Sequence, residues 1–279
     1  MEILKTKIAL ETFVSPLKAI GKKVALVPTM GALHNGHISL IDLAKQSADI
    51  IICSIFVNPT QFTDLKDLEK YPRPIEHDLE MLKNAGCDAV FMPSVDEMYP
   101  KEEHWHIDLG PAEFLLEGEF RKGHYQGVTQ IVKKLFDAVK PDIAMFGQKD
   151  FQQVLMIKNM VAHFHLPIQI VTCPIIRESD GLAMSSRNIH LLSLDRENSL
   201  VLSKALKFVV AHFNDNSLRK LEESAKALFE LIDGVELDYF TIANGDNLQP
   251  AQSKNEHHLV ALVAAKVGKT RLIDNMIIK

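Results

Sequence analysis

The segment that most constrains this chain is residues 24–37, VALVPTMGALHNGH. A short apolar run, typical of a buried strand, ends at Pro28 in a glycine-containing turn. Two histidines, His34 and His37, stand where a helix is expected to begin. The first N–H groups of a helix attract anions, and imidazoles add donors that can carry charge near neutral pH. The segment therefore predicts a site for nucleotide phosphates at the end of a strand, where α/β sheets hold their ligands.

The composition is typical of a globular protein, with 279 residues, 47% of them apolar and 24% charged. The net charge of −5 disfavours a nucleic-acid partner, which needs a basic face. The first residues lack a signal-peptide core, and the apolar stretch at residues 48–57 is too short to span a bilayer, so no membrane partner is expected.

The three cysteines are widely spaced and form no CxxC pair: Cys53, Cys87 and Cys173. Neither a disulfide framework nor a zinc site is therefore expected, and a reducing cytoplasm fits best. Cys53 and Cys173 lie in apolar runs, which favours small core residues over nucleophiles.

Strand-like apolar runs alternate with helical patterns in the first part of the chain. Strands are expected at residues 24–27, 50–57, 89–92, 105–109, 142–146 and 168–172. Helices are expected at residues 37–47, 78–84, 128–139 and 150–164, and loops at 60–77 and 115–124. The alternation predicts the α/β class, with a Rossmann-like doubly wound parallel sheet in which the runs at 24–27 and 50–57 are neighbours.

The pattern changes after Pro174. Helices are expected within residues 193–233, and strands at 237–242, 259–267 and 271–278, the last two joined as a hairpin. This is the pattern of a smaller α+β domain. We therefore expect two domains, residues 1–175 and 176–279.

Two further polar loops follow predicted strands. Asn58 and Gln61 can hydrogen-bond hydroxyl and carboxylate groups of a small polar substrate without imposing charge. Gly147 lets the backbone approach a ligand closely, and Lys149 can neutralise phosphate charge. One of the glutamines at residues 152–153 should face the same cleft, because the carboxyl ends of the strands share one edge.

A third polar segment lies at the predicted domain junction. Ser185, Ser186 and Arg187 combine two hydroxyls with a guanidinium, as a phosphate clamp does, and a junction can anchor a closing lid. Three further cations near loops are each interpreted as solvated surface charges: Arg121, His124 and Arg177.

The chain resembles the pantothenate synthetase family over nearly its whole length. The family's motifs occur in order and spacing at residues 28–37 (PTMGALHNGH), 56–62 (FVNPTQF), 71–73 (YPR), 121–124 (RKGH), 147–153 (GQKDFQQ) and 180–188 (DGLAMSSRN). This family belongs to the HxGH nucleotidylyltransferases, whose fold is related to that of class I tRNA synthetases. The resemblance implies an ATP-dependent ligation in two steps. The carboxylate of pantoate attacks the α-phosphate of Mg-ATP to give pantoyl adenylate and pyrophosphate, and β-alanine then displaces AMP to give pantothenate.

The resemblance also implies roles for individual residues. The ATP site would consist of Met30, Gly31, Ala32, Leu33, His34, Asn35, Gly36, His37, Gly147, Gln148, Lys149, Asp150, Ile176, Met184, Ser185, Ser186 and Arg187. The catalytic residues among them would be His34, His37, Lys149, Ser185, Ser186 and Arg187, with His37 the usual candidate for proton donor. Asp150 would contact the ribose and the backbone of Ile176 the adenine. Gln61 and Gln153 would bind pantoate, with Asn58 nearby.

The resemblance assigns no protein ligand to a metal. Many relatives have Glu where Gln148 stands, and some have paired acids where His77 precedes Asp78, so Mg²⁺ is expected on ATP phosphates and water. A homodimer joined through the amino-terminal domain and a carboxy-terminal lid are also implied. Two alternatives stay open: another HxGH enzyme that acts on a phosphate ester, which would not need Gln61 and Gln153 together, and a non-catalytic nucleotide sensor.

Overall fold

The structure is a computed structural model that describes residues 1–63 and 65–279. The described chain forms two compact units. The first is Met1–Gly147 with Gln153–Pro174, and the second is Gln148–Gln152 with Ile175–Lys279. Within the described residues, no helix is both long and apolar enough to cross a membrane.

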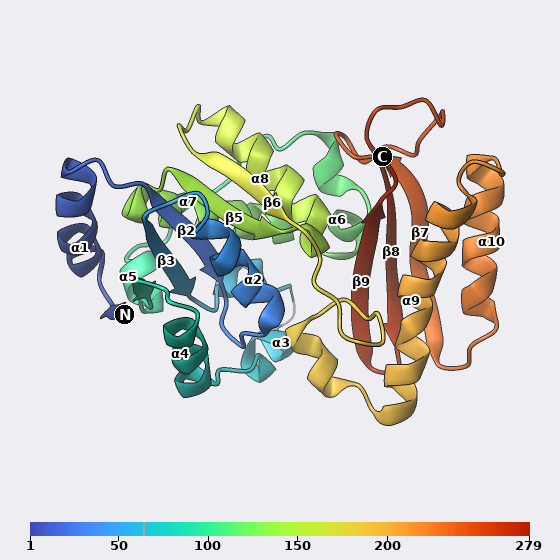
Figure 1. Cartoon of the computed structure of the whole chain (residues 1–279), viewed down its shortest axis with the longest axis horizontal. Helices are drawn as coiled ribbons and strands as arrows, with labels where there is room; N and C mark the ends of the chain where they lie inside the picture. The colour runs from blue at the N-terminus through green and yellow to red at the C-terminus, as the bar shows by residue number, and fades with distance from the viewer. Residues whose placement is uncertain (64) are drawn as a thin grey trace. The chain divides into compact units, whose positions relative to one another are not determined.

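The first unit is built on a six-stranded parallel sheet (Figure 1). In spatial order its strands are β1 Glu2–Leu4, β4 Ala89–Phe91, β3 Ile50–Ile55, β2 Val24–Thr29, β5 Ile143–Gly147 and β6 Gln169–Cys173. The pairing of β2 with β3 confirms the expected parallel neighbours. The chain runs from β2 through β3 to β4 on one side and resumes at β5 on the other side of β2. The topological switch point therefore lies between β2 and β5.

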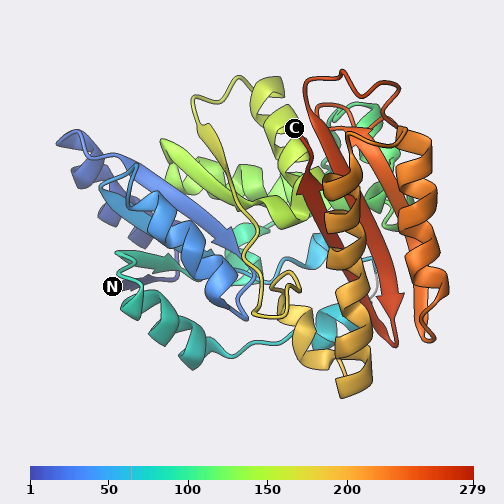
Figure 2. The same ribbon diagram turned by 45° about the vertical axis from the view of Figure 1, so that its right-hand side comes forward.

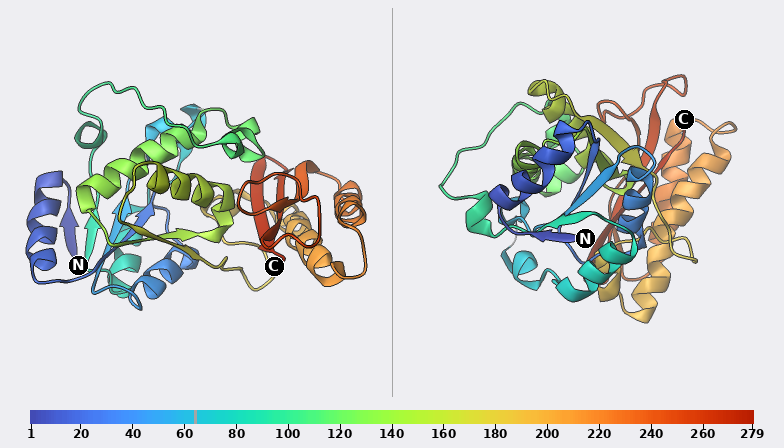
Figure 3. Two further views of the ribbon diagram at one scale, coloured as in Figure 1. Left: turned by 90° about the horizontal axis from the view of Figure 1, so that it is seen from above. Right: turned by 60° about the vertical axis from the view of Figure 1, so that its left-hand side comes forward.

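Helices cover both faces of this sheet (Figure 3). On one face, α7 His124–Val139 packs against β2 and against α1 Lys7–Ala19. On the other face, α2 Asn35–Ala44 packs against β2 and β5, beside α4 Ile75–Asn84. Further short or peripheral elements of this unit are η1 Pro59–Gln61, α3 Leu65–Lys70, α5 Val95–Met98, η2 Pro111–Phe114, α6 Glu117–Phe120 and most of α8 Phe151–His163. The turn η3 Gln148–Asp150, between β5 and α8, belongs to the second unit.

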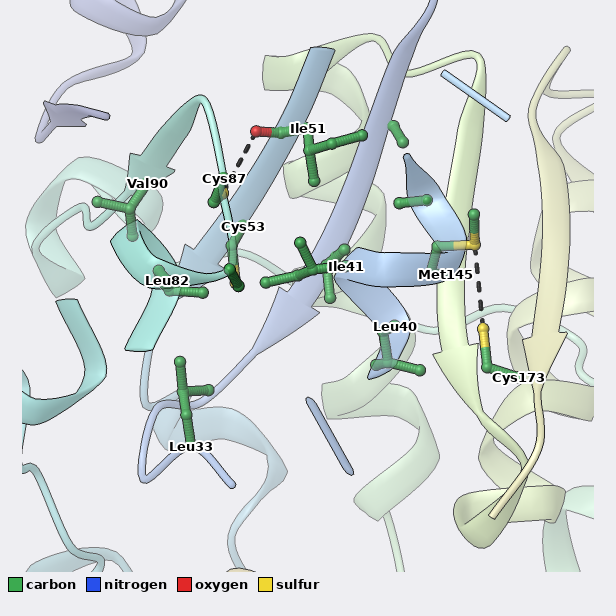
Figure 4. Close-up of a cluster of buried hydrophobic side chains, with 14 of the residues drawn as sticks. Leu33, Leu40, Ile41, Ile51, Cys53, Leu82, Cys87, Val90, Met145 and Cys173 are labelled. Atoms are coloured by element: carbon green, nitrogen blue, oxygen red, sulfur yellow. Dashed lines mark hydrogen bonds between the residues drawn. The ribbon is translucent and has the colours of Figure 1, made fainter. Parts of the chain in front are cut away.

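The face of the sheet under α2 carries a continuous apolar core (Figure 4). Ile41 of α2 and Leu82 of α4 are fully buried there, and burial of each such side chain contributes about 1.5–3 kcal/mol. The core also contains the three cysteines as buried free thiols: Cys53, Cys87 and Cys173. The structure thus confirms the prediction that Cys53 and Cys173 are core residues.

The second unit is a three-stranded antiparallel sheet with two helices packed against it (Figure 2). Its main elements are η4 Ser186–His190, α9 Ser193–His212, α10 Leu218–Glu230, β7 Val235–Asn244, β8 Leu259–Val267 and β9 Thr270–Ile277. Val267 pairs with Thr270, which confirms the predicted hairpin between the last two strands. The parallel sheet and this smaller sheet together confirm the predicted α/β fold with a smaller α+β part.

The prediction of a loop at residues 60–77 is wrong over part of this range. It contains the end of η1, the helix α3 and the beginning of α4, which starts at Ile75 and not at residue 78. The Leu, Lys and Glu residues of α3 are strong helix formers, and the polarity of the segment concealed them. Residue 64 of the expected loop lies outside the described residues.

The strand expected at residues 105–109 is also absent from the structure, where these residues form neither strand nor helix. The N–H and C=O groups of Ile107 bond the Gln126 amide at 3.1 and 3.0 Å, and Trp105 Nε1 donates to Thr129 Oγ1 at 3.2 Å. Side chains of α7 therefore take the place of a neighbouring strand. The expected loop at 115–124 contains α6, and β1 and α1 have no counterpart in the sequence prediction.

Candidate active site

The predicted site residues of the first unit follow three adjacent strands, β2, β3 and β5. Because these strands are parallel, their carboxyl ends share one edge of the sheet, at the switch point between β2 and β5. Gln153 stands in the first turn of α8, after β5, and is half-buried. This edge is where open α/β sheets bind their ligands.

His34 and His37 are joined to one another at the start of α2. His34 is the N-cap residue, and its Nδ1 accepts a hydrogen bond from the Gly36 N–H at 3.1 Å. His37 Nδ1 accepts one from the His34 N–H at 3.3 Å, and the ring centroids lie 4.1 Å apart. This is a capping box built from two imidazoles. The prediction that both histidines stand at the start of a helix is confirmed, although the helix begins at Asn35 and not at residue 37.

In these contacts both rings accept through Nδ1. A neutral imidazole that accepts through Nδ1 carries its proton on Nε2. In the neutral state, His34 and His37 therefore each have an Nε2–H donor beside the first turn of α2. Two side-chain donors and a helix amino terminus at one position form a binding site for an anion.

The loop that precedes α2 is held by a buried carboxylate. Gly31 and Ala32 have φ of +79° and +50°, a left-handed turn that directs two successive amides toward Asp78. Asp78 Oδ2 accepts from Ala32 at 2.8 Å, and Oδ1 accepts from Leu33 at 2.7 Å. Burial raises the pKa of Asp78, although the two amide bonds act to lower it.

Asp78 is a site residue that the sequence reasoning missed. Its side chain is fully buried on α4, and a Cβ added at Gly31 would stand 2.9 Å from Asp78 Oδ2. The signal was present in the sequence, because Ile75, Asp78, Leu79 and Leu82 share one helical face and the acid interrupts an apolar stripe.

Asn58, Gln61 and Met30 form one connected cluster. Asn58 Nδ2 donates to Gln61 Oε1 and to the Gly127 carbonyl, each at 3.1 Å. Gln61 Nε2 in turn lies 3.0 Å from Met30 Sδ. The structure thus joins Gln61, which is predicted to bind pantoate, and Asn58, which is predicted to lie nearby, to Met30, the first residue of the predicted ATP site.

Protein groups use the full hydrogen-bonding capacity of the Asn58 side chain. In addition to the two bonds from Nδ2, Oδ1 accepts from the Tyr99 hydroxyl at 2.7 Å and from the Thr60 hydroxyl at 3.2 Å. A side-chain amide has two donor hydrogens and two acceptor lone pairs, so these contacts satisfy it. Burial raises the pKa of Tyr99 to about 12, which keeps its hydroxyl protonated as a donor. Asn58 therefore orients Gln61.

The beginning of α7 packs against this cluster. His124 is buried and its Nδ1 lies 2.8 Å from the Gln61 carbonyl oxygen. Gly127 approaches so closely that a Cβ there would clash with the Thr60 carbonyl. The interpretation of His124 as a solvated surface charge is therefore wrong, because the packing of α7 on η1 removes its side chain from solvent.

The remaining predicted site residues lie in the second unit. The turn η3 contains Gln148, Lys149 and Asp150. Residues 176–184 form a hairpin that leads into the serines, and the Met184 N–H donates to the Ile176 carbonyl at 3.0 Å. Ser185 caps η4, where its Oγ accepts from the Arg187 N–H at 3.3 Å.

Two features of the second unit differ from expectation. Residues 148–152 were placed in the first domain, but Asn275 of β9 donates to the carbonyls of Gln148 and Lys149 at 2.9 and 3.0 Å, and the turn belongs to the second unit. Arg177 is not a solvated charge, because it makes two bonds of 2.6 and 3.0 Å with the buried Asp274 carboxylate.

A family model described as pantoate-beta-alanine ligase matches residues 2–277. The chain belongs to the pantoate–β-alanine ligase family. The pantothenate synthetase of Porphyromonas gingivalis strain ATCC 33277 is 47% identical over 281 residues, covering 99% of both chains. That of Acetivibrio thermocellus is 43% identical over 286 residues, covering 100% of both chains.

Solved structures of the family have the same fold. The pantothenate synthetase of Thermus thermophilus matches with a TM-score of 0.94 and 35% identity, over 100% of this chain and 99% of that chain. The pantoate-beta-alanine ligase of Francisella tularensis, solved in complex with β,γ-ATP and β-alanine, matches with a TM-score of 0.82 and 34% identity, over 99% of this chain and 97% of that chain. As a member of this family, the chain is a ligase of pantothenate biosynthesis.

Proposed function

We propose that this ligase joins pantoate to β-alanine with cleavage of ATP to AMP and pyrophosphate, and that the carboxyl edge of β2, β3 and β5 binds the reactants. The observation that carries the proposal is the reciprocal capping of His34 and His37. It places two Nε2–H donors beside the amino terminus of α2, which suits the polyphosphate of a nucleotide.

The residues assigned to ATP come from both units of the chain. Those of the first unit are residues 30–37 and Gly147. In the second unit Lys149 binds phosphates, Asp150 the ribose and the Ile176 backbone the adenine. The segment 184–187, with Ser185, Ser186 and Arg187, clamps phosphate oxygens, for which hydroxyls and a guanidinium are suitable donors.

Pantoate binds through Gln61 and Gln153, whose neutral amides can recognise hydroxyl and carboxylate groups. Asn58 contributes indirectly, because its bond to Gln61 Oε1 determines how that amide is turned. The carboxylate of pantoate thereby keeps its charge, which it needs as a nucleophile.

The chemistry requires positioning more than proton transfer. An ionised carboxylate can attack the α-phosphate in line without a general base, and pyrophosphate leaves as the P–O bond breaks. Negative charge then grows on oxygens that the Nε2–H groups of His34 and His37 can stabilise. Adenylation turns a poor acyl donor into a good one, and the neutral amine of β-alanine then attacks the acyl carbon with AMP as leaving group.

Magnesium enters as Mg-ATP. In the chain as described, apart from residue 64, no group of three or more His, Cys, Asp or Glu side chains is arranged to hold a metal, so the ion's ligands would be phosphate oxygens and water. By resemblance, the assignment also includes a cytoplasmic homodimer, with the first unit binding nucleotide and pantoate and the second unit, which includes residues 148–152, acting as a lid.

The test is product analysis with Mg-ATP and pantoate, with and without β-alanine. Pantothenate, AMP and pyrophosphate are expected in equal amounts. Pantoate labelled with ¹⁸O in its carboxylate should transfer one ¹⁸O to AMP, because that oxygen bridges to phosphorus in the adenylate. Formation of ADP and phosphate, or of AMP without ¹⁸O, would contradict the adenylate route. Transfer of AMP to a phosphate ester would identify a different HxGH enzyme.

A further inference from the structure

Strand β9 carries two buried polar residues in succession. The side chains of Asp274 and Asn275 are 2% and 1% exposed. Successive residues of a strand face opposite sides of a sheet, so Asp274 and Asn275 are buried on opposite sides of β9. Polar groups so deeply buried need partners. The partner of Asp274 lies in the hairpin that leads into the predicted phosphate clamp, and the partners of Asn275 lie in the turn of Lys149.

Asp274 binds the hairpin that leads to the serine loop. Its carboxylate accepts from both terminal nitrogens of Arg177, at 2.6 and 3.0 Å. The same guanidinium donates to the Gly181 carbonyl at 3.1 Å and to the Asn275 carbonyl at 3.3 Å. Arg177 and Gly181 belong to the hairpin of residues 176–184, which continues directly into Ser185. The hairpin is thereby fixed to β9.

Asn275 binds the lysine turn. Its Nδ2 donates to the carbonyls of Gln148 and Lys149 at 2.9 and 3.0 Å, and its Oδ1 accepts from Gln148 Nε2 at 3.0 Å. One side-chain amide thus holds the backbone on either side of the Lys149 N–H and Cα. These contacts account for the place of residues 148–152 in the second unit, although the chain enters and leaves this turn from the first.

We propose that Asn275 is a positioning residue for adenylate formation. With Asp274 and Arg177, it holds the Lys149 turn and the Ser185–Ser186–Arg187 segment in one body, so that their charged and hydroxyl groups reach the polyphosphate in a constant arrangement. This inference rests on the proposed function. Asn275 itself contacts only protein, and it acts through the backbone of residue 149.

The arrangement has a kinetic consequence. Cationic and hydroxyl groups stabilise a transition state best when they are already in place, and a misplacement of about 1 Å can reduce a rate about 100-fold. Loss of the Asn275 amide should therefore impair the step that breaks the α–β bond of ATP. The attack of β-alanine on the finished adenylate breaks no bond to the polyphosphate, so kcat/KM for β-alanine should stay unchanged.

The test compares Asn275→Ala and Asn275→Asp with the wild-type enzyme. The aspartate variant has the same size but offers the two carbonyls an acceptor where they need a donor. Asn244→Ala is the matched control, because it removes an asparagine amide from the same sheet, where Asn244 Nδ2 donates to Glu256 at 2.8 Å. Melting temperature, kcat, KM for ATP and KM for β-alanine are measured, together with hydrogen exchange of the amides of residues 148–152.

For both Asn275 variants we expect faster exchange at residues 148–152 and a loss of about 10- to 100-fold in kcat/KM for ATP, with kcat/KM for β-alanine unchanged. The Asn244→Ala control should match the wild type in exchange at residues 148–152, in kcat/KM for ATP and in the kinetics with β-alanine. Wild-type exchange and ATP kinetics in a folded Asn275 variant would overturn the proposal. So would a lower melting temperature with unchanged kinetics, because that result describes a purely structural residue.

The two proposals fail in different ways. The absence of pantothenate formation by the wild-type enzyme counts against the proposed function. Hydrogen exchange of residues 148–152 measures how firmly Asn275 fixes the Lys149 turn, and it requires no catalytic activity. Wild-type exchange in the variants therefore counts against the positioning role alone. If Asn275→Ala does not fold, the isosteric Asn275→Asp variant supplies the same comparison.

Discussion

The Asp78 carboxylate accepts a hydrogen bond of 2.7 Å from the backbone N–H of Leu33, across 45 positions of sequence. Its other oxygen accepts the N–H of Ala32 at 2.8 Å. These two bonds tie α4 to the loop that leads into the histidine capping box. The position of the two imidazoles therefore depends on Asp78, which is distant in sequence. Both of these bonds go to the backbone of the loop and not to an imidazole.

Asp78→Asn should disturb this loop although it changes the side-chain volume little. One oxygen becomes an NH₂ group, which would point a donor at a backbone donor. Leaving a buried hydrogen-bonding group without a partner costs about 1–3 kcal/mol of unfolding free energy. We expect a lower melting temperature and a higher KM for ATP, measured by thermal melting and steady-state kinetics. An unchanged KM for ATP would show that the loop keeps its shape without the second acceptor.

His34→Ala should affect both folding and activity, because His34 caps α2 and carries an Nε2–H donor. Loss of an N-cap costs about 0.5–2 kcal/mol. His34→Asn separates the two effects, since asparagine is a strong N-cap residue but does not reach as far as an imidazole. The asparagine variant should recover the melting temperature of the wild type and stay deficient in kcat/KM for ATP. Recovery of both quantities would reduce His34 to a helix cap.

His37→Ala should lower turnover by about 100- to 1,000-fold while the protein still folds, since one donor to the transition state is lost. His37→Gln tests whether the ring donates a hydrogen bond or transfers a proton. Glutamine can donate a hydrogen bond but cannot transfer a proton, so it should be more active than alanine if His37 stabilises charge. Equal inactivity of both variants would favour proton donation, and near-wild-type turnover of His37→Ala would contradict any catalytic role.

Gly127→Ala should disrupt the packing of α7 on η1, because the new methyl group would clash with the Thr60 carbonyl and stand 2.8 Å from Gln61 Cα. Overpacking of this kind costs about 1–3 kcal/mol. We expect a lower melting temperature and a higher KM for pantoate. Gly147→Ala is the control for stability, since among the described residues, its two chain neighbours aside, nothing lies within 4 Å of its added Cβ. Similar melting temperatures for the two variants would contradict the argument from packing.

The cysteines should be unreactive in the folded protein. Burial raises the pKa of both Cys87 and Cys173 to about 11 from the ordinary value of 9.0. At pH 8 both are neutral thiols, and iodoacetamide, which reacts with thiolates, should label them only after denaturation. The pKa of each thiol is higher in the folded than in the unfolded protein. The contribution of these thiols to the free energy of unfolding is therefore complete below pH 9 and declines as the pH rises to about 11. Labelling of the native protein at pH 8, followed by mass spectrometry, checks the first statement, and melting between pH 8 and 11 checks the second.

The sequence by itself determined the fold class and the family. Period and length of the apolar runs predicted the parallel sheet and the smaller antiparallel one, because burial acts on local patterns of side chains. The histidine pair and the amides Asn58 and Gln61 were recognised because each follows a buried strand closely, where a parallel sheet brings loop residues to one edge. Where the local pattern was weak, as in the three-residue strand β1 and the polar helix α3, the prediction failed.

The tertiary structure decided which residues hold the site in place. Each of three residues contacts a site segment that is distant in sequence. The separation is 45 positions for Asp78, 63 for His124 and 126–127 for Asn275. No local pattern encodes such a contact, because a carboxylate, an imidazole or an amide is compatible with solvent until a distant element removes it from water. For the same reason Arg177 was mistaken for a surface charge and residues 148–152 were placed in the first domain. Their partners, Asp274 and Asn275, lie on β9 and contact them only in the folded protein.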